Sequence, residues 1–171
     1  MRRSNLPLCL VMLAGCTSYR VSTSAPPPAH VFAPTPAGAA QICVVRPHQV
    51  GALAPAVVHD NGHLVGVTKG PTYFCYLAQP GQHLLASRYG DDVDRDLGTD
   101  QVEEASVTAE PGRRYFLHHD VSNPLVLSVR WVAEPAARPM IDACRYAQLQ
   151  EVPGDEALPE PDQLVPAIAA R

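Results

Sequence analysis

The chain has 171 residues, with 13 basic and 17 acidic side chains, so its formal net charge is −4 with neutral histidines. An acidic protein has no electrostatic reason to bind nucleic acid or anionic lipid head groups. The sequence also contains no glycine-rich phosphate loop and no basic-aromatic platform, so we expect no nucleic-acid partner. Its 18 prolines, about twice the usual share, concentrate at the two ends and indicate one folded domain between flexible ends.

The first fifteen residues are typical of a secretory signal peptide. Met1-Arg2-Arg3 is basic, and the apolar run from Leu6 to Ala14 is much shorter than the roughly 20 residues that a membrane-spanning helix needs. The run ends in Leu13-Ala14-Gly15-Cys16, which resembles the lipobox of bacterial lipoproteins. The resemblance implies that residues 1–15 are removed and that Cys16 is acylated on its thiol and on its new amino group.

The lipid implied at Cys16 predicts where the protein works. Each buried acyl CH2 contributes roughly 0.8 kcal/mol, so the three chains of the lipoprotein pattern would form a permanent membrane anchor. Residue 17 is threonine, whereas an aspartate there tends to retain Gram-negative lipoproteins at the inner membrane, so the resemblance favours the outer membrane. Loss of Arg2 and Arg3 leaves 11 basic against 17 acidic residues, a charge of −6, so we expect the lipid to make the membrane contact.

The segment over residues 16–40 is rich in serine, threonine, alanine and proline without an apolar period, and we expect it to be a tether. A domain of period-2 strands follows over residues 41–150, and its clearest hairpin turn is Asn61-Gly62, because both central positions of a type I′ turn have positive φ. The expected strands cover residues 41–46, 56–60, 63–68, 72–78, 82–87, 102–108, 113–119 and 125–132.

The end of the chain contains the one helix that the sequence predicts, over residues 138–149. Met140, Ile141, Cys144 and Leu149 can share one face there. The acidic, proline-broken residues 151–171 are expected to be disordered. These elements predict a mostly β fold, an antiparallel sandwich or partly open barrel of about eight short strands with one C-terminal helix.

Turn motifs give residues 41–150 a resemblance to a family of bacterial lipoprotein β-domains without an assigned function, and more distantly to PEGA-type surface domains. The motifs are the strand end Arg46-Pro47, the hairpin Val58–Gly66, the stretch Gly70–Phe74 with Pro80–His83, and the later Pro111–Phe116. Because glycine and proline set turns, these motifs support a fold, and the family supplies no catalytic residues.

Five cysteines are present, of which Cys9 leaves with the signal peptide and Cys16 carries lipid. The other three, in an oxidising compartment, allow at most one internal disulfide. We expect Cys43–Cys75 if their strands are neighbours, with Cys75–Cys144 as the second pairing. Three buried thiols that pack as small hydrophobic groups are the alternative.

An acidic loop is the strongest metal-binding pattern. Taking Asp92 as position 1 of the calcium pattern D-x-D-x-D-G-x5-E, Glu103 falls at position 12. Position 6 is Leu97 where the pattern has glycine, and no flanking helices are evident. A solvated acidic loop is the plain alternative, and a Ca²⁺-dependent binding domain is the second functional hypothesis. The residues that fall close to the pattern are Asp92, Asp94, Asp96, Gly98, Asp100 and Glu103, and Gly98 comes one residue late.

Histidines suggest a second metal pattern. His59 and His63 flank the hairpin turn, and His118-His119-Asp120 ends a strand, so the two strand ends could converge on Zn²⁺. His118 and His119 point to opposite faces of a strand, so only one of them could serve. Surface histidines without a metal are the alternative.

Nucleophile patterns are weak. Cys75 with His83 or His119 could form a thiolate pair, but Cys75 lies in an apolar strand where thiols are inert, and His83 is most simply structural. No G-x-S-x-G motif is present, so a hydrolase is the third hypothesis. We expect a non-catalytic envelope lipoprotein without metal or cofactor, anchored through Cys16, acting as a structural or binding module for an envelope protein or glycan.

Overall fold

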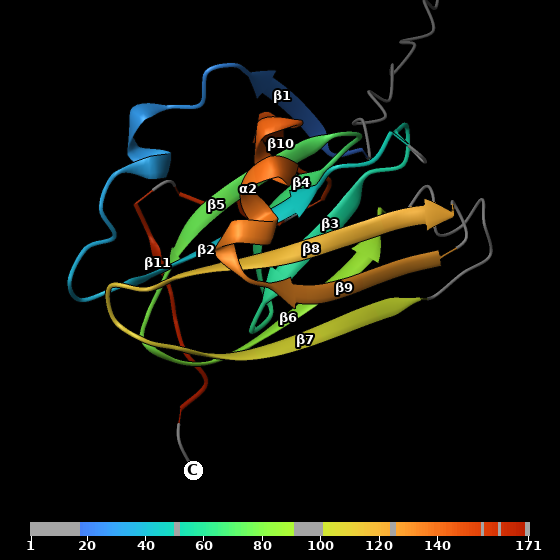
Figure 1. Cartoon of the computed structure of the whole chain (residues 1–171). Helices are drawn as coiled ribbons and strands as arrows, with labels where there is room; N and C mark the ends of the chain where they lie inside the picture. The colour runs from blue at the N-terminus through green and yellow to red at the C-terminus, as the bar shows by residue number, and fades with distance from the viewer. Residues whose placement is uncertain are drawn as a thin grey trace, which may run out of the picture.

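The computed structural model describes residues 18–49, 52–90, 101–123, 126–154, 156–160 and 162–169. Over these residues the chain is mostly β, with two sheets and one α-helix, as the sequence predicts (Figure 1). The larger sheet has the strand order β1-β10-β5-β2-β8-β9, and β11 also pairs with β5. These strands are β1 (Arg20–Ser24), β2 (Ala40–Arg46), β5 (Thr72–Ala78), β8 (Arg114–Asn123), β9 (Val126–Val132), β10 (Arg145–Glu151) and β11 (Leu164–Val165).

The smaller sheet has the order β4-β3-β6-β7, and all its pairings are antiparallel. Its hairpin turns at Asn61 and Gly62, whose φ values of 49° and 83° are the positive angles that the Asn-Gly motif predicts. The bounds predicted for the two strands of this hairpin agree with the structure. The sheet consists of β3 (Ala56–Asp60), β4 (His63–Thr68), β6 (Gly81–Tyr89) and β7 (Val102–Ala109).

The larger sheet differs from a purely antiparallel one. β2 pairs in parallel with β8, and β10 and β11 each pair in parallel with β5. All seven residues of β2 are buried because the strand lies between β5 and β8 and is covered on both faces. Its last residue, Arg46, is fully buried and donates from Nη1 to the Ala54 carbonyl oxygen at 2.9 Å.

The disulfide in the structure joins Cys43 of β2 to Cys75 of β5, which are directly opposed partners in the antiparallel ladder. This is the favoured pairing, so the alternatives of a Cys75–Cys144 bond or three free thiols are wrong. Cys144 keeps its thiol, which donates to the Arg46 carbonyl oxygen at 3.4 Å. Burial raises the pKa of this thiol to about 11, so it is not an activated nucleophile.

The helix expected over residues 138–149 is wrong in its second half. Helix α2 (Glu134–Asp142) lies against β2 and β8 and buries Ala137 and Ile141, and the chain then enters β10. The helix ends there because the Arg145 amide bonds the Pro71 carbonyl oxygen at 3.1 Å, which starts a ladder with β5. Five residues of β10 also pair with β1, so sheet pairing outweighs the helical period.

Both ends of the domain reach further than the sequence predicts. The expected tether over residues 16–40 contains β1 and a 3₁₀ turn, η1 (Ala29–Phe32), whose Val31 is 1 % exposed. The expected disordered tail over residues 151–171 contains β11, and its Val165 is 9 % exposed. Within the described residues, both segments add strands to the larger sheet. Hydrogen bonding to the domain orders them, although their composition alone predicts no regular structure.

Candidate functional site

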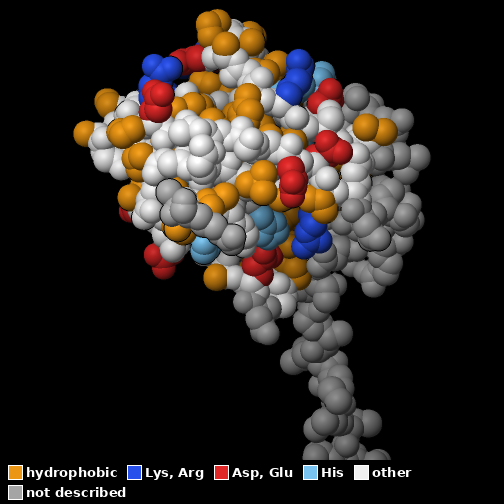
Figure 2. Space-filling view, turned by 90° about the horizontal axis from the view of Figure 1, so that it is seen from below, with side chains coloured by type: hydrophobic (Ala, Val, Ile, Leu, Met, Phe, Trp, Pro, Cys, Tyr) orange, Lys and Arg blue, Asp and Glu red, His pale blue; other side chains and the backbone are white. Residues whose placement is uncertain are grey.

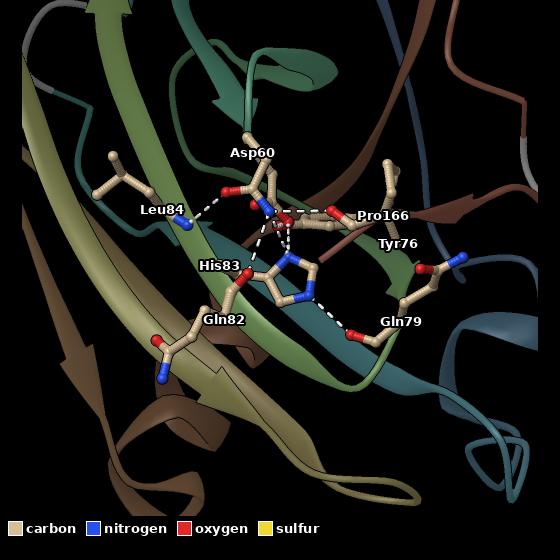
Figure 3. A network of polar contacts seen from close by, with 8 residues as sticks. Asp60, Tyr76, Gln79, Gln82, His83, Leu84 and Pro166 are labelled. Carbon is tan, nitrogen blue, oxygen red and sulfur yellow. Dashed lines mark hydrogen bonds and ion pairs between the residues drawn. The ribbon is translucent and has the colours of Figure 1, made fainter. Parts of the chain in front are cut away.

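A buried polar network lies where β3 ends and β6 begins (Figure 3). His83 Nδ1 lies 2.7 Å from Asp60 Oδ2, and both side chains are completely buried. His83 Nε2 lies 2.7 Å from the Gln79 carbonyl oxygen, and the Tyr76 hydroxyl donates to Asp60 Oδ2 at 2.9 Å. The network therefore links three strands of the two sheets.

The hydrogen bonds of His83 favour its charged form. A carbonyl oxygen only accepts, so Nε2 carries a hydrogen, and Nδ1 donates a second one to the carboxylate. Burial, the largest single influence, opposes the charge, but the bonds to Asp60 and Gln79 and the Asp60 charge outweigh it and raise the pKa of His83. Burial, together with Asp60, also raises the pKa of Tyr76. His83 and Asp60 thus form a buried ion pair, and its hydrogen bonds serve the structure of the domain.

Asn61 joins this network to the C-terminal segment, which is defined here as residues 156–169 without residue 161. Asn61 Nδ2 donates to the Pro166 carbonyl oxygen at 2.9 Å, and Asn61 Oδ1 accepts from the Leu84 amide at 2.9 Å. The turn residue that the sequence selects for its positive φ therefore also fastens β6 and the C-terminal segment to the hairpin.

A second anchor holds the start of the C-terminal segment. Glu156 Oε1 lies 2.6 Å from His59 Nε2, and Glu156 Oε2 accepts from the Tyr19 hydroxyl at 2.9 Å. At the other end, β11 pairs with β5, and the Ile168 amide bonds the Gln82 carbonyl oxygen at 2.9 Å. The C-terminal segment is therefore held to the domain at both of its ends.

A groove lies between β4 and the strands β5 and β10, and the C-terminal segment forms part of its wall. It consists of two adjoining cavities with volumes of about 120 and 260 Å³. The sheets approach closely here, since a Cβ on Gly66 would lie 2.6 Å from the Phe74 ring. Both cavities are lined by Val65, Tyr76, Pro159 and Glu160.

Two strand edges border this groove. β4 is the last strand of its sheet, and no strand among the described residues pairs with its outer edge. On β5, β10 pairs with residues 72–73 and β11 with residues 77–78, and in the part of the chain that the structure describes no strand pairs with residues 74–76 on that side. Open edges of this kind are templates for an added extended segment.

The histidines that the sequence singled out lie at separate places. His59 bonds Glu156, and His63 is exposed, while the structure groups His118 and Asp120 with His48 instead. Within the described residues, the possible convergence of His59 and His63 with His118-His119-Asp120 on a metal is not found. His48 carries no signal in the sequence, because only the parallel pairing of β2 with β8 brings the residues after β2 beside His118.

His119 lies inside the molecule, on the face of β8 opposite to His118, as strand alternation requires. Its Nδ1 lies 3.0 Å from the Thr68 hydroxyl and its Nε2 lies 2.8 Å from the Ser87 hydroxyl. Burial lowers its pKa to about 3, with Arg46 and His118 adding to the effect. His119 is thus a neutral core residue that links the two sheets.

The remaining candidates do not form a site within the described residues. Cys75 is part of the disulfide, so a thiolate pair with His83 or His119 is wrong for this structure. The candidate calcium loop Asp92–Glu103 lies outside the described residues except for its end, where Glu103 accepts from Gln101 Nε2 at 3.0 Å. Cys16 also lies outside them.

Comparison with known proteins gives no assignment. No protein-family model matches the chain, and no curated protein matches it significantly. Among the described residues, no helix has the length and apolar character that spanning a membrane requires.

Proposed function

We propose that this chain is a lipid-anchored, non-catalytic binding module of a bacterial cell envelope, held by Cys16 at the outer membrane. The support for the anchor is Leu13-Ala14-Gly15-Cys16 behind Arg2 and Arg3, with the nine-residue apolar run between them. The net charge of −4 supports a lipid rather than a basic patch as the membrane contact, and the face in Figure 2 has acidic, basic and apolar side chains interspersed.

The proposed binding site is the groove between β4 and β5. Two strand edges border two adjoining cavities with polar and apolar linings, and the chain's own C-terminal segment already adds a short strand there. An extended peptide from an envelope protein is the ligand that fits this arrangement, because its backbone can bond to the strand edges while its side chains enter the cavities. A glycan would lack the regular amide and carbonyl groups that an open strand edge selects.

Loss of the acylated thiol should remove the lipid anchor. We expect Cys16→Ser to be unprocessed or released, because without acyl chains an acidic domain has no other strong contact with the bilayer. Fractionation of cells expressing each form, with intact mass of the membrane-extracted wild type, measures this. Cys144→Ser is the matched control and should stay membrane-bound. Wild-type protein found unmodified at Cys16 would refute the anchor.

A photo-crosslinking residue at Gln148 should give a discrete adduct in living cells. Gln148 is exposed on β10 and lines the first cavity, whereas Ser128 is exposed on β9, outside both cavities, and serves as the control position. A synthetic peptide of residues 156–169 should lower the yield of the adduct by competing for the groove. Glu156→Ala should raise the yield, because it removes the contacts of Glu156 with His59 and Tyr19 that hold the start of the C-terminal segment. Equal adducts from both positions, or no effect of the peptide, would contradict the groove as the binding site.

A further inference from the structure

A cluster of three metal-binding side chains lies on the outer face of the larger sheet, away from the groove. His48, His118 and Asp120 each offer one ligand atom, and the three atoms lie within 4.8 Å of one another. His118 and Asp120 are two residues apart on β8, so they share one face of the strand. Val45 of β2 pairs in parallel with His118, which brings the residues after β2 to the same place.

Two polar atoms of this cluster lack a hydrogen-bond partner among the described residues. His118 Nε2 and Asp120 Oδ1 are both buried, and the whole His118 residue is 2 % exposed. A buried polar atom without a partner costs about 1–3 kcal/mol, and such atoms in a folded protein call for an explanation such as an ion. His48 is exposed, so its ring can turn toward the other two ligands.

We propose that His48, His118 and Asp120 bind a divalent transition-metal ion, for which Zn²⁺ is the test ion. Two imidazole nitrogens and one carboxylate oxygen are a donor set that Zn²⁺ uses with a fourth position open. Zn²⁺ bonds of about 2.0–2.1 Å in a tetrahedron separate the ligand atoms by about 3.3 Å. His48 is exposed and Asp120 is half-buried, so rotations of these two side chains can bring the ligand atoms closer to one ion.

Arg130 competes with the ion. Its Nε donates to His118 Nδ1 at 3.2 Å, so in the metal-free state Nδ1 holds the lone pair and a neutral ring carries its hydrogen on Nε2. An ion on Nδ1 takes the place of Arg130. An ion on Nε2 moves the ring hydrogen to Nδ1, where it would face the donor of Arg130. Either way the guanidinium must leave, and it is free to do so because Arg130 is exposed.

The test is calorimetric titration of the purified, membrane-extracted full chain with ZnCl2, after treatment with EDTA and dialysis. We expect one Zn²⁺ per chain, and binding about 10-fold or more weaker in His48→Ala and in Asp120→Asn. Arg130→Gln should bind Zn²⁺ more tightly than the wild type. His63→Ala is the matched control, since His63 is exposed and lies outside the cluster, and it should bind as the wild type does.

Each variant should keep the metal-free melting temperature of the wild type to within a few degrees. His48→Ala and Arg130→Gln change exposed residues and were chosen for that reason. Absence of Zn²⁺ heat in the wild type, an equal loss in His63→Ala, or weaker binding in Arg130→Gln would each overturn the proposal. Titration with CaCl2 should give no heat that depends on His48, because Ca²⁺ prefers oxygen ligands.

Discussion

Asp60→Ala should destabilise the domain by about 3–5 kcal/mol, because it leaves a buried histidine that has no carboxylate partner. The pair has no access to solvent, and Asp60 Oδ2 also accepts from Tyr76, so one substitution removes two hydrogen bonds across strands. Urea denaturation at pH 6 measures this loss. Glu151→Ala is the control: its ion pair with Arg20 is exposed, and we expect a loss below about 1 kcal/mol.

The pH dependence identifies the ion pair as the cause. Because the folded-state pKa of His83 is raised above its ordinary value of 6.5, its stabilising contribution is complete below pH 6.5 and is lost as the pH rises through the folded-state value. Asp60→Asn removes the charge but keeps the shape. The stability difference between wild type and Asp60→Asn should therefore be larger at pH 6 than at pH 9. A difference that does not change with pH would show that His83 is neutral in the folded protein.

Local turn chemistry explains which elements the sequence predicts well. The bounds of β3, β4 and β5 agree with prediction because Asn61-Gly62 fixes one hairpin and Gly70-Pro71 begins the next strand. The favoured disulfide depended on a condition that the structure meets, namely that two strand-like runs with central cysteines are neighbours. The turns depend on a few adjacent residues, so a single sequence contains them.

Long-range strand pairing explains which elements the sequence predicts wrongly. Met140 and Ile141 do lie on a helix, but Leu149 lies on β10, where it packs against a cluster that contains Tyr19 and Val57. The strand exists because β1, more than 120 residues earlier in the chain (Ser22 to Gln148 is 126 residues), offers an edge. The sequence predicts a flexible tether where β1 forms and a helix over most of β10, so no local pattern could indicate that they pair.

The candidate sites illustrate the same limit. The groove is formed by β4, β5, β10 and a segment that the sequence predicts to be disordered, so the turn motifs of β4 and β5 indicate strands but do not indicate a groove between them. In the metal cluster, the spacing of His118 and Asp120 was visible, but the third ligand, His48, follows a strand whose parallel partner cannot be read from sequence. The sequence therefore indicates two candidate metal ligands at the end of β8, and only the fold brings the third ligand beside them.

The Cys43→Ala/Cys75→Ala double variant should lose about 3–4 kcal/mol of unfolding free energy, since the bond closes a loop with a sequence separation of 32 in the unfolded chain. The double variant is preferable to either single one, because a lone Cys75 could pair with Cys144. Urea denaturation with and without dithiothreitol measures the effect. The reductant should weaken the wild type by a similar amount and leave the double variant unchanged. Cys144→Ala, which removes the free thiol, should keep the wild-type response to reductant.

This prediction connects the fold to the compartment proposed for it. The bond lies at the centre of the larger sheet, and Cys43 has no exposed surface, so the link stiffens the strand on which β5 and β8 both pair. A loss of 3–4 kcal/mol is a large part of the roughly 5–15 kcal/mol that stabilises a typical domain, so the protein should be markedly less stable in a reducing cytoplasm than in an oxidising envelope. Wild-type protein that unfolds at the same urea concentration with and without reductant would remove this argument for an envelope location, whatever the state of Cys16.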